Sequence, residues 1–479
     1  MLRTVADQPS LWEAILPEEL RRLPPELARI DVLLDDPVFF APFVPFFDPR
    51  MGRPSTPMET YLRLMFLKFR YRLGYESLCR EVSDSITWRQ FCRIGIDQPV
   101  PHPTTLMKLT TRCGSVAVNG LNEALLAKAV AAKVLRTTKV RVDTTVVPAN
   151  VAYPTDSGLL AKAVNRIATT GRRIRAAGGA VRTKLCDRSR AAGKRAHDLN
   201  AKLRTRNAAA RDEALAIVRH KNLELADLAE TAAAEAQRLL ANAERAIRTA
   251  KKKAAQLKAE GRSDAAAGRR RGRLVRAVND LTELLDATRR IAAQTRQRMA
   301  GTTPDGATRR VSLHDPDARP IAKGRLGKPV EFGAKAQVCD NADGIVLDHD
   351  VQPGNPADAP RLKPVVERVK KRTGRTPRTV AADRGYGEAS VDDTLHDLGV
   401  ANVVIPRKGR PTKDRQAHER RRSIRQTVKW RTGCEGRISH LKRSYGWDRT
   451  MIDTTEGARI WTGQGVFAHN LTKIATLTA

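Results

Sequence analysis

The fold is decided by the stretch TKVRVDTTVV, residues 138–147, which sets one acidic side chain, Asp143, inside an apolar, β-branched run. Such a run predicts a buried strand. A carboxylate in a buried strand costs free energy unless it is paired or binds a metal ion. Taken alone, Asp143 could be a surface or capping carboxylate, so its interpretation depends on further acids elsewhere in the chain.

Two further acids complete the pattern. Asp383 follows a second strand-like run in RTVAADRGY, residues 378–386, and Glu435 lies on a predicted helix in RTGCE, residues 431–435. Two strands and one helix could bring the three carboxylates together. Such a cluster would hold two divalent cations for phosphoryl chemistry on a nucleic acid backbone. Carboxylate and phosphate oxygens suit Mg²⁺, with Mn²⁺ as a possible substitute.

The charge balance indicates the same kind of partner. The chain has 87 Lys and Arg residues against 52 Asp and Glu, a formal net charge of +35. This charge attracts polyanions and gives salt-dependent, sequence-independent affinity for phosphate backbones. A GC-rich coding bias would inflate Arg and Ala, but it would not by itself unbalance the acids this far.

Several other classes of protein are disfavoured. No run approaches the ~20 apolar residues of a membrane span, and residues 1–7 lack the apolar segment of a secretory signal. The six cysteines are scattered without a Cys-x-x-Cys pair, which argues against a zinc ribbon or a disulfide framework and fits a reducing cytosol. No P-loop is legible, so no nucleotide cofactor is expected.

Residues 1–135 are expected to form a helical domain. A short helix is predicted over 11–15, and a stronger one opens at Thr56-Pro57, since Pro is tolerated in a first helical turn. A later helix opens at Thr104 and Thr105 and could belong to a helix-turn-helix, where small polar residues reach phosphates or base edges. A plain helical domain that packs on a catalytic core is the alternative.

Residues 158–304 differ from the rest, since 158–300 contain neither aromatic residues nor proline. Leucines at helical spacing predict amphipathic helices packed as a coiled coil. A helix over about 193–259 would be roughly 100 Å long, at ~1.5 Å per residue. Shorter helices over 158–187 and 265–299 would return the chain, so we expect an arm inserted between two strands. Its basic clusters either form a solvated face or contact DNA or a second subunit.

Strands are predicted again after residue 310. The segments 330–338 and 344–348 predict a hairpin with a turn at Asp343-Gly344. The remaining expected elements are a helix over 355–371, a strand over 376–382, a helix over 390–398, a strand over 403–405 and a helix over 456–476. Residues 407–431 contain eleven Lys and Arg residues and few apolar ones, which predicts a mobile segment.

This order of elements is that of an RNase H-like domain, and the sequence resembles insertion-sequence transposases of the DDE class, most closely the ISNCY type. In related transposases the third motif is Tyr, two residues, Arg, three residues, Glu, six residues, Lys. Arg431, Glu435 and Lys442 fit this spacing, whereas Val428 stands at the Tyr position. The other stretches that carry the resemblance are 54–76, 143–146 with 153–156, 354–358 with Asp358, and 383–386.

The resemblance implies an α/β fold with a helical N-terminal domain (1–135), an RNase H-like catalytic domain (136–157 and 305–479) and an inserted helical arm (158–304). Asp143 would share both metal ions, while Asp383 and Glu435 would each complete one side. Arg431 and Lys442 would contact DNA, and Thr104 and Thr105 would do so as well if their helix belongs to a helix-turn-helix.

The expected activity is metal-dependent cleavage at the ends of an insertion sequence and joining of the 3′ ends to target DNA. Expected partners are double-stranded DNA and further copies of the chain, in a dimer or higher oligomer, and the expected location is the bacterial cytoplasm at the nucleoid. The alternatives are a catalytically inactive, transposase-derived architectural protein and an RNase H-like nuclease.

Overall fold

The computed structural model describes residues 1–5, 17–204, 211–323, 327 and 329–478, so the helix predicted over 11–15 lies outside the described residues. The chain divides into two compact units, one formed by residues 1–150 with 321–479 and the other by residues 151–320. Each unit has a hydrophobic core of its own.

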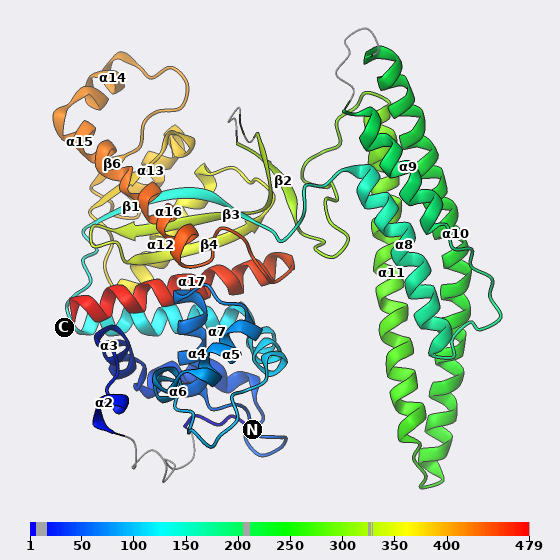
Figure 1. Cartoon of the computed structure of the whole chain (residues 1–479). Coiled ribbons are helices and arrows are strands. Elements are labelled where there is room, and N and C mark those ends of the chain that lie inside the picture. The colour runs from blue at the N-terminus through cyan, green and yellow to red at the C-terminus, as the bar shows by residue number, and fades with distance from the viewer. Residues whose placement is uncertain (6–16, 205–210, 324–326, 328, 479) are drawn as a thin grey trace. The chain divides into compact units, whose positions relative to one another are not determined.

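A mixed sheet, six-stranded within the described part of the chain, forms the centre of the first unit (Figure 1). Its central strand β1 (Lys139–Pro148) pairs antiparallel with β3 (Val330–Asn341) and parallel with β5 (Thr379–Ala382). Three further strands complete it: β2 (Arg319–Ala322) and β4 (Val346–Pro353), which neighbour β3, and β6 (Asn402–Val404), which is parallel to β5. The predicted hairpin is confirmed as β3 and β4, whereas β2 was not predicted.

Helices pack against this sheet. α16 (Gly433–Ser444) packs on β1 and β3, and α15 (Arg422–Arg431) packs on β5 and β6. α12 (Leu362–Thr373) and α17 (Thr454–Leu477) both pack on β4. Two short elements, η4 (Arg384–Tyr386) and α13 (Ala389–Asp397), connect β5 to β6, and η3 (Ala359–Arg361) precedes α12.

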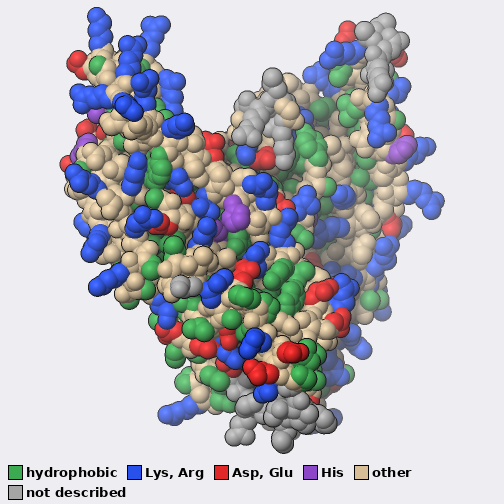
Figure 2. All heavy atoms as spheres, turned by 60° about the vertical axis from the view of Figure 1, so that its left-hand side comes forward, with side chains coloured by type: hydrophobic (Ala, Val, Ile, Leu, Met, Phe, Trp, Pro, Cys, Tyr) green, Lys and Arg blue, Asp and Glu red, His purple; other side chains and the backbone are tan. Residues whose placement is uncertain are grey.

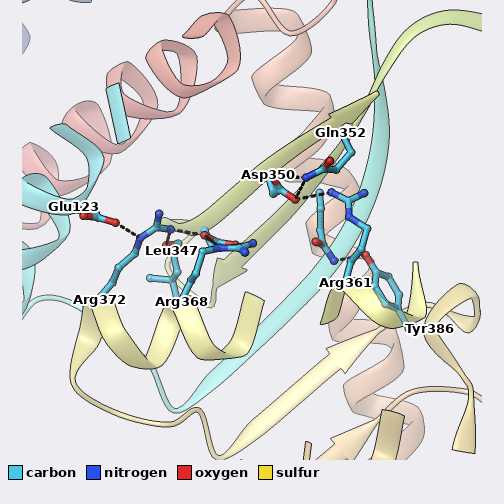
Figure 3. Close-up of polar contacts among 10 residues, drawn as sticks. Glu123, Leu347, Asp350, Gln352, Arg361, Arg368, Arg372 and Tyr386 are labelled. Carbon is cyan, nitrogen blue, oxygen red and sulfur yellow. Dashed lines mark hydrogen bonds and ion pairs between the residues drawn. The ribbon is translucent and has the colours of Figure 1, made fainter. Parts of the chain in front are cut away.

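Ion pairs hold α12 on the sheet. Arg368 of α12 donates to the fully buried Asp348 of β4 at 2.7 Å, and Arg372 pairs with the same carboxylate. Arg372 also donates to the carbonyl oxygen of Leu347 at 3.1 Å. Figure 3 shows both arginines reaching from the helix toward β4. Because a buried charge is tolerated only when it is paired, these contacts fix the helix at this position.

The N-terminal helices share their core with the sheet. Residues of α4 (Met58–Arg70) are almost all buried, and its Arg63 is neutralised by Asp31 at 2.8 Å. The long α7 (Pro103–Ala131) packs along α17 and bends at Gly114, whose φ of +64° suits a residue without a side chain. The other elements are α2 (Glu18–Arg21), α3 (Pro25–Leu34), η1 (Pro37–Phe39), η2 (Ala41–Phe46), α5 (Tyr75–Asp84) and α6 (Ile86–Phe91).

The second unit consists of helices packed around a core rich in Leu and Ala (Figure 1). They are α8 (Asp156–Ala176), α9 (Ser189–Lys202), α10 (Arg211–Ala259) and α11 (Ala265–Met299). The prediction of one helix over 193–259 was wrong, because α9 ends at Lys202 and α10 begins at Arg211. α10 packs along α11, α8 and α9. The buried face of α10 is rich in Ala, whose small side chain lets neighbouring helices approach closely.

The segment 407–431 was expected to be mobile, but most of it is helical. It contains α14 (Lys413–Arg420) and α15. Thr412 caps α14 by accepting from the N–H of Arg415 at 3.3 Å, and the Arg415 side chain pairs with Asp392 at 2.8 Å. Specific caps and pairs therefore order a sequence whose composition alone suggests disorder. No helix within the described residues is long and apolar enough to cross a membrane.

Candidate active site

Asp143 and Asp383 are neighbours because of the strand register. β1 and β5 run parallel with Val142 opposite Ala382. The next residue along each strand is an acid, so the two carboxylates leave the sheet at the same level. Asp383 also accepts a hydrogen bond from the N–H of Gly385 at 3.0 Å, which ends β5 and begins the turn η4.

Glu435 reaches this pair from α16 through a shared cation. Nη1 of Arg431 donates to Oδ2 of Asp143 at 2.9 Å, and its Nη2 donates to Oε1 of Glu435 at 3.0 Å. The sequence placed Arg431 and Glu435 on a single helix. The structure divides that helix at Thr432, with Arg431 as the last residue of α15 and Glu435 in the first turn of α16.

The two aspartates are hard to ionise together. Burial raises the pKa of Asp143 to about 6, and repulsion from Asp383 and Glu435 adds to the shift, while Arg431 opposes it. Burial also raises the pKa of Asp383, with the Asp358 carboxylate as the next cause. Buried acids that repel one another are stabilised in the charged form by a nearby cation.

Arg431 supplies that cation in this conformation. Burial lowers the pKa of its guanidinium, but attraction to Asp143, Glu435 and Asp383 outweighs this effect and leaves the pKa raised. All three predicted acids therefore act on one positive charge. Among the described residues, no three His, Cys, Asp or Glu side chains form a ready metal-binding group. The donor set nevertheless fits a hard divalent cation, because carboxylates that already surround a positive charge supply oxygen ligands.

A second ion pair, missed from the sequence, positions the junction between α15 and α16. The buried Arg141 forms a bidentate pair with the buried Asp340 across β1 and β3, at 2.7 and 2.9 Å. Its Nη1 donates to the carbonyl oxygen of Trp430 at 2.9 Å, and its guanidinium lies 4.7 Å from the Trp430 ring centroid. Arg141 is two residues from Asp143 on β1, so both side chains point to the same face. This spacing of two residues is the feature of the sequence from which Arg141 could have been predicted to lie near the site.

A further carboxylate lies beside Asp383. Asp358 pairs with Lys335 of β3 at 2.8 Å, and Lys335 also donates to the carbonyl oxygen of Pro356 at 3.0 Å. A Cβ atom at Gly385 would lie 3.1 Å from an Asp383 oxygen and 3.2 Å from an Asp358 oxygen. The sequence singled out Asp358 only within a resembling stretch and assigned it no role.

Tyr386, next to this turn, is held by the same strand. Its hydroxyl accepts a hydrogen bond from Gln337 of β3 at 2.8 Å, and its ring is fully buried. Figure 3 shows Tyr386 below Arg361, at the end of the row of polar contacts that runs along β4. Together, Lys335 and Gln337 tie the segment that carries Asp383 to β3.

The other predicted DNA-binding residues lie apart from the acids. Lys442 is in the last turn of α16, seven residues after Glu435, and so shares its helix face. Thr104 and Thr105 are exposed in the first turn of α7, where Nδ1 of His102 accepts a hydrogen bond from the Thr104 N–H at 3.3 Å. Between these two threonines and the acids, no contact is recorded within the described ranges.

Comparison with known proteins identifies two domains. A family model described as a transposase domain (DUF772) matches residues 13–112, and one described as a transposase DDE domain matches residues 297–471. No curated protein and no solved structure matches the chain. The DDE match contains Asp383 and Glu435, whereas Asp143 lies upstream of it.

The DDE domain implies an RNase H-like fold, in agreement with the mixed sheet. The matches do not name the ISNCY type, which stays a prediction. The two models together cover more than half of the 479 residues. Transposases of this class act on DNA and generally use divalent metal ions. The chain belongs to the DDE transposases of insertion sequences.

Proposed function

We propose that this transposase cleaves DNA at the ends of its insertion sequence and joins the 3′ ends to target DNA, using Asp143, Asp383 and Glu435. The observation that carries the proposal is the register of β1 and β5, which sets Asp143 and Asp383 side by side. Arg431 pairs with both Asp143 and Glu435, which supports the assignment of the third acid to the same site.

Divalent cations, Mg²⁺ or Mn²⁺, held by these three carboxylates would lower the pKa of the attacking hydroxyl and stabilise the leaving 3′ oxygen. The chain itself supplies the placement of the ligands. Asp143 is fixed within a buried strand, and Asp383 is held by the N–H of Gly385. Glu435 follows the junction of α15 and α16, where Arg141 binds the carbonyl oxygen of Trp430. Ligands on rigid elements keep the geometry that phosphoryl transfer requires.

DNA would be held by basic side chains near these acids. Arg431 and Lys442 flank Glu435, and Lys and Arg side chains gather over α14 and α15 (Figure 2). Thr104 and Thr105 would contact the backbone at the start of α7. The net charge of +35 supports strong, salt-dependent binding to phosphates.

We further propose that the helices of residues 151–320 act in assembly and not in chemistry. Their faces carry basic residues beside an apolar core, as in α11, where Arg269, Arg270 and Arg271 precede the buried Leu274. They would pair subunits or clamp DNA when two element ends are brought together, in a dimer or higher oligomer.

The test uses the full chain and a labelled duplex that carries the element's ends. Nicking and joining should require Mg²⁺ or Mn²⁺ and stop with a chelator. Asp143→Asn, Asp383→Asn and Glu435→Gln should each abolish both reactions and leave DNA binding largely intact. Full activity in any one variant would remove that residue from the site. Cleavage without joining would favour a nuclease, and binding without cleavage would favour an architectural protein.

A further inference from the structure

A pocket of about 1,090 Å³ lies away from the three acids, in the first unit. Its walls are the C-terminal end of α4, the first turn of α5, the side of α7 and the loop of residues 446–453, with Trp461 of α17 at one side. None of the residues assigned to catalysis or DNA binding lines it.

Lys68 lines this pocket with a buried side-chain amine. Its side chain is 2% exposed, and its Nζ lies 4.0, 4.5 and 4.7 Å from the ring centroids of Trp461, Phe69 and Tyr75. Among the residues that the structure describes, no carboxylate lies within 4 Å of this Nζ. Burial lowers the pKa of Lys68 to about 7. Near neutral pH the amine is therefore divided between its neutral and charged forms, and the aromatic rings together with an anion in the pocket would favour the charged form.

The first turn of α5 faces the same pocket. α5 has ten residues, and its N-cap is Gly74, which makes no side-chain capping hydrogen bond. The N–H groups of a first helical turn have no acceptor within the helix and favour an anion. Arg80 and Arg449 add positive charge at the rim, while Arg72 is already paired with Asp448 at 2.6 Å. Glu76 in this turn and Asp453 in the loop also line the pocket, and Arg80 lies 3.7 Å from Glu81. These acids weaken the positive field without cancelling it, because four Lys and Arg side chains face three acids in the pocket wall.

We propose that this pocket binds a phosphate group, with Lys68 as its counter-ion and the first turn of α5 as its hydrogen-bond donor. A phosphate would supply the negative charge that favours the charged form of the buried amine. A hard, multiply charged anion also matches a site that combines N–H donors with Arg side chains at its rim.

The phosphate has two possible sources, a DNA backbone or free phosphate, and DNA is the one that the fold favours. α16 carries the chain from Glu435 to the loop at Gly446, about 16 Å at ~1.5 Å per residue. That distance corresponds to roughly five base pairs at ~3.4 Å each. A duplex held at the three acids and running in the direction of α16 would reach the pocket. This choice of source rests on the proposed function, whereas the site itself does not.

The test compares Lys68→Met with Lys363→Met, which removes an exposed lysine of α12 in the same unit. DNA binding is measured by fluorescence anisotropy in a chelator across a range of salt concentrations, so that no cleavage occurs. We expect Lys68→Met to weaken binding about tenfold and to lower the salt slope by about 0.9. Lys363→Met should leave both values near those of the unchanged protein. Circular dichroism checks folding, and Lys68→Gln replaces the Met variant if that variant does not fold.

A second measurement separates the two sources. Inorganic phosphate, added at constant ionic strength, should raise the thermal midpoint of the unchanged protein by about 2–4 °C at tenfold excess over its Kd, and Lys68→Met should lose this effect. Stabilisation by phosphate with an unchanged DNA slope would assign the site to free phosphate. If Lys68→Met keeps the DNA affinity, the slope and the stabilisation, the pocket binds no phosphate and Lys68 is only a packed core residue. Loss of cleavage in Asp143→Asn is scored separately, so the two proposals fail independently.

Discussion

Arg431 lies 2.9 Å from Asp143, with its Nη1 donating to Oδ2 of the buried carboxylate. The side chain of Arg431 is only 13% exposed, so this pair is shielded from solvent. Because the same guanidinium also binds Glu435, one arginine offsets part of the negative charge of the three acids. Metal binding would then compete with Arg431, and the released side chain would be available to a DNA phosphate.

Arg431→Gln tests this competition. Without the guanidinium, the variant should bind Mn²⁺ more tightly, on the order of tenfold, because no charge-assisted pair has to be broken. The metal-free variant should also be less stable by roughly 1–3 kcal/mol, since Asp143 loses its buried partner. Calorimetric titration with Mn²⁺ and thermal unfolding in a chelator measure the two effects.

Arg431→Lys is the matched control, because it keeps one charge and loses the fork that spans both acids. It should lie between Gln and the unchanged protein in both measurements. An unchanged or weaker affinity for Mn²⁺ in Arg431→Gln would contradict the competition and leave Arg431 as a plain DNA ligand.

Gly385→Ala probes how closely Asp383 must be placed. The added Cβ would approach Asp383 and Asp358 to 3.1 and 3.2 Å, so one or both carboxylates must shift by a few tenths of an ångström. Cleavage should slow by roughly tenfold, because small misplacements of catalytic groups are costly, while DNA binding stays unchanged. Single-turnover cleavage and anisotropy separate the two.

Gly436→Ala is its control, as a methyl group added beside Glu435 meets no atom within 4 Å. This change should leave cleavage unchanged and stabilise α16 by about 0.5–1 kcal/mol. Equal rates in both alanine variants would mean that the position of Asp383 is not sensitive at this scale.

The acids of the site could be chosen from the sequence because strands leave a strong local signal. Apolar, β-branched runs identified β1 and β5: Asp143 lies in the middle of β1, and Asp383 directly follows β5. The parallel register that makes Asp143 and Asp383 neighbours is a tertiary property, which the sequence suggested only through its resemblance to a known family.

Long-range partners could not be read from the sequence. Arg141 and Asp340 are about 200 positions apart, and Lys335 meets Asp358 only because β3 lies beside the following turn. The helices α14 and α15 were missed for a different reason: composition predicts disorder, while Thr412 and Asp392 supply caps and pairs that composition does not register.

Lys442→Ala should weaken DNA binding about equally across sequences and lower the salt slope by about one, as expected for a single phosphate contact. Anisotropy with two unrelated duplexes measures both. A loss restricted to one sequence would indicate base reading instead.

In the same assay, joint replacement of Thr104 and Thr105 by Ala should reduce affinity. Unchanged affinity would leave the start of α7 as part of a helical domain that only packs on the core.

Asp348→Asn should destabilise the protein by about 3 kcal/mol, because the fully buried carboxylate that pairs with both Arg368 and Arg372 is lost. The loss is limited because Arg372 keeps its pair with Glu123 at 3.4 Å and Arg368 is partly exposed. Asp350→Asn is the comparison on the same strand (Figure 3), since Asp350 is partly exposed and pairs with Arg361 at 3.0 Å. Its effect should be below about 2 kcal/mol. Urea unfolding measures the free energy of unfolding of both variants, and Asp348→Asn should lose more. An equal loss in the two variants would show that burial of the carboxylate does not determine the loss of stability.

Replacement of residues 151–318 by a Gly/Ser linker, which keeps β2 whole, tests the proposed role of the helices α8 to α11. β1 and β2 flank β3 on opposite sides, so the linker has to cross about two strand spacings, or ~10 Å. Eight residues span that distance, because a flexible chain reaches roughly 5–6 Å times the square root of its length. The sheet and its acids should therefore stay folded.

In the shortened protein, Mn²⁺ binding and nicking of single DNA ends should persist, while complexes that pair two ends should become much rarer on native gels. A partial change offers a milder comparison: Arg269, Arg270 and Arg271 replaced by Gln keep α11 and remove its charge. If the linker variant unfolds, the helices belong to the catalytic core. If paired complexes form as before in both variants, the basic residues are only a solvated face, and assembly depends on the first unit.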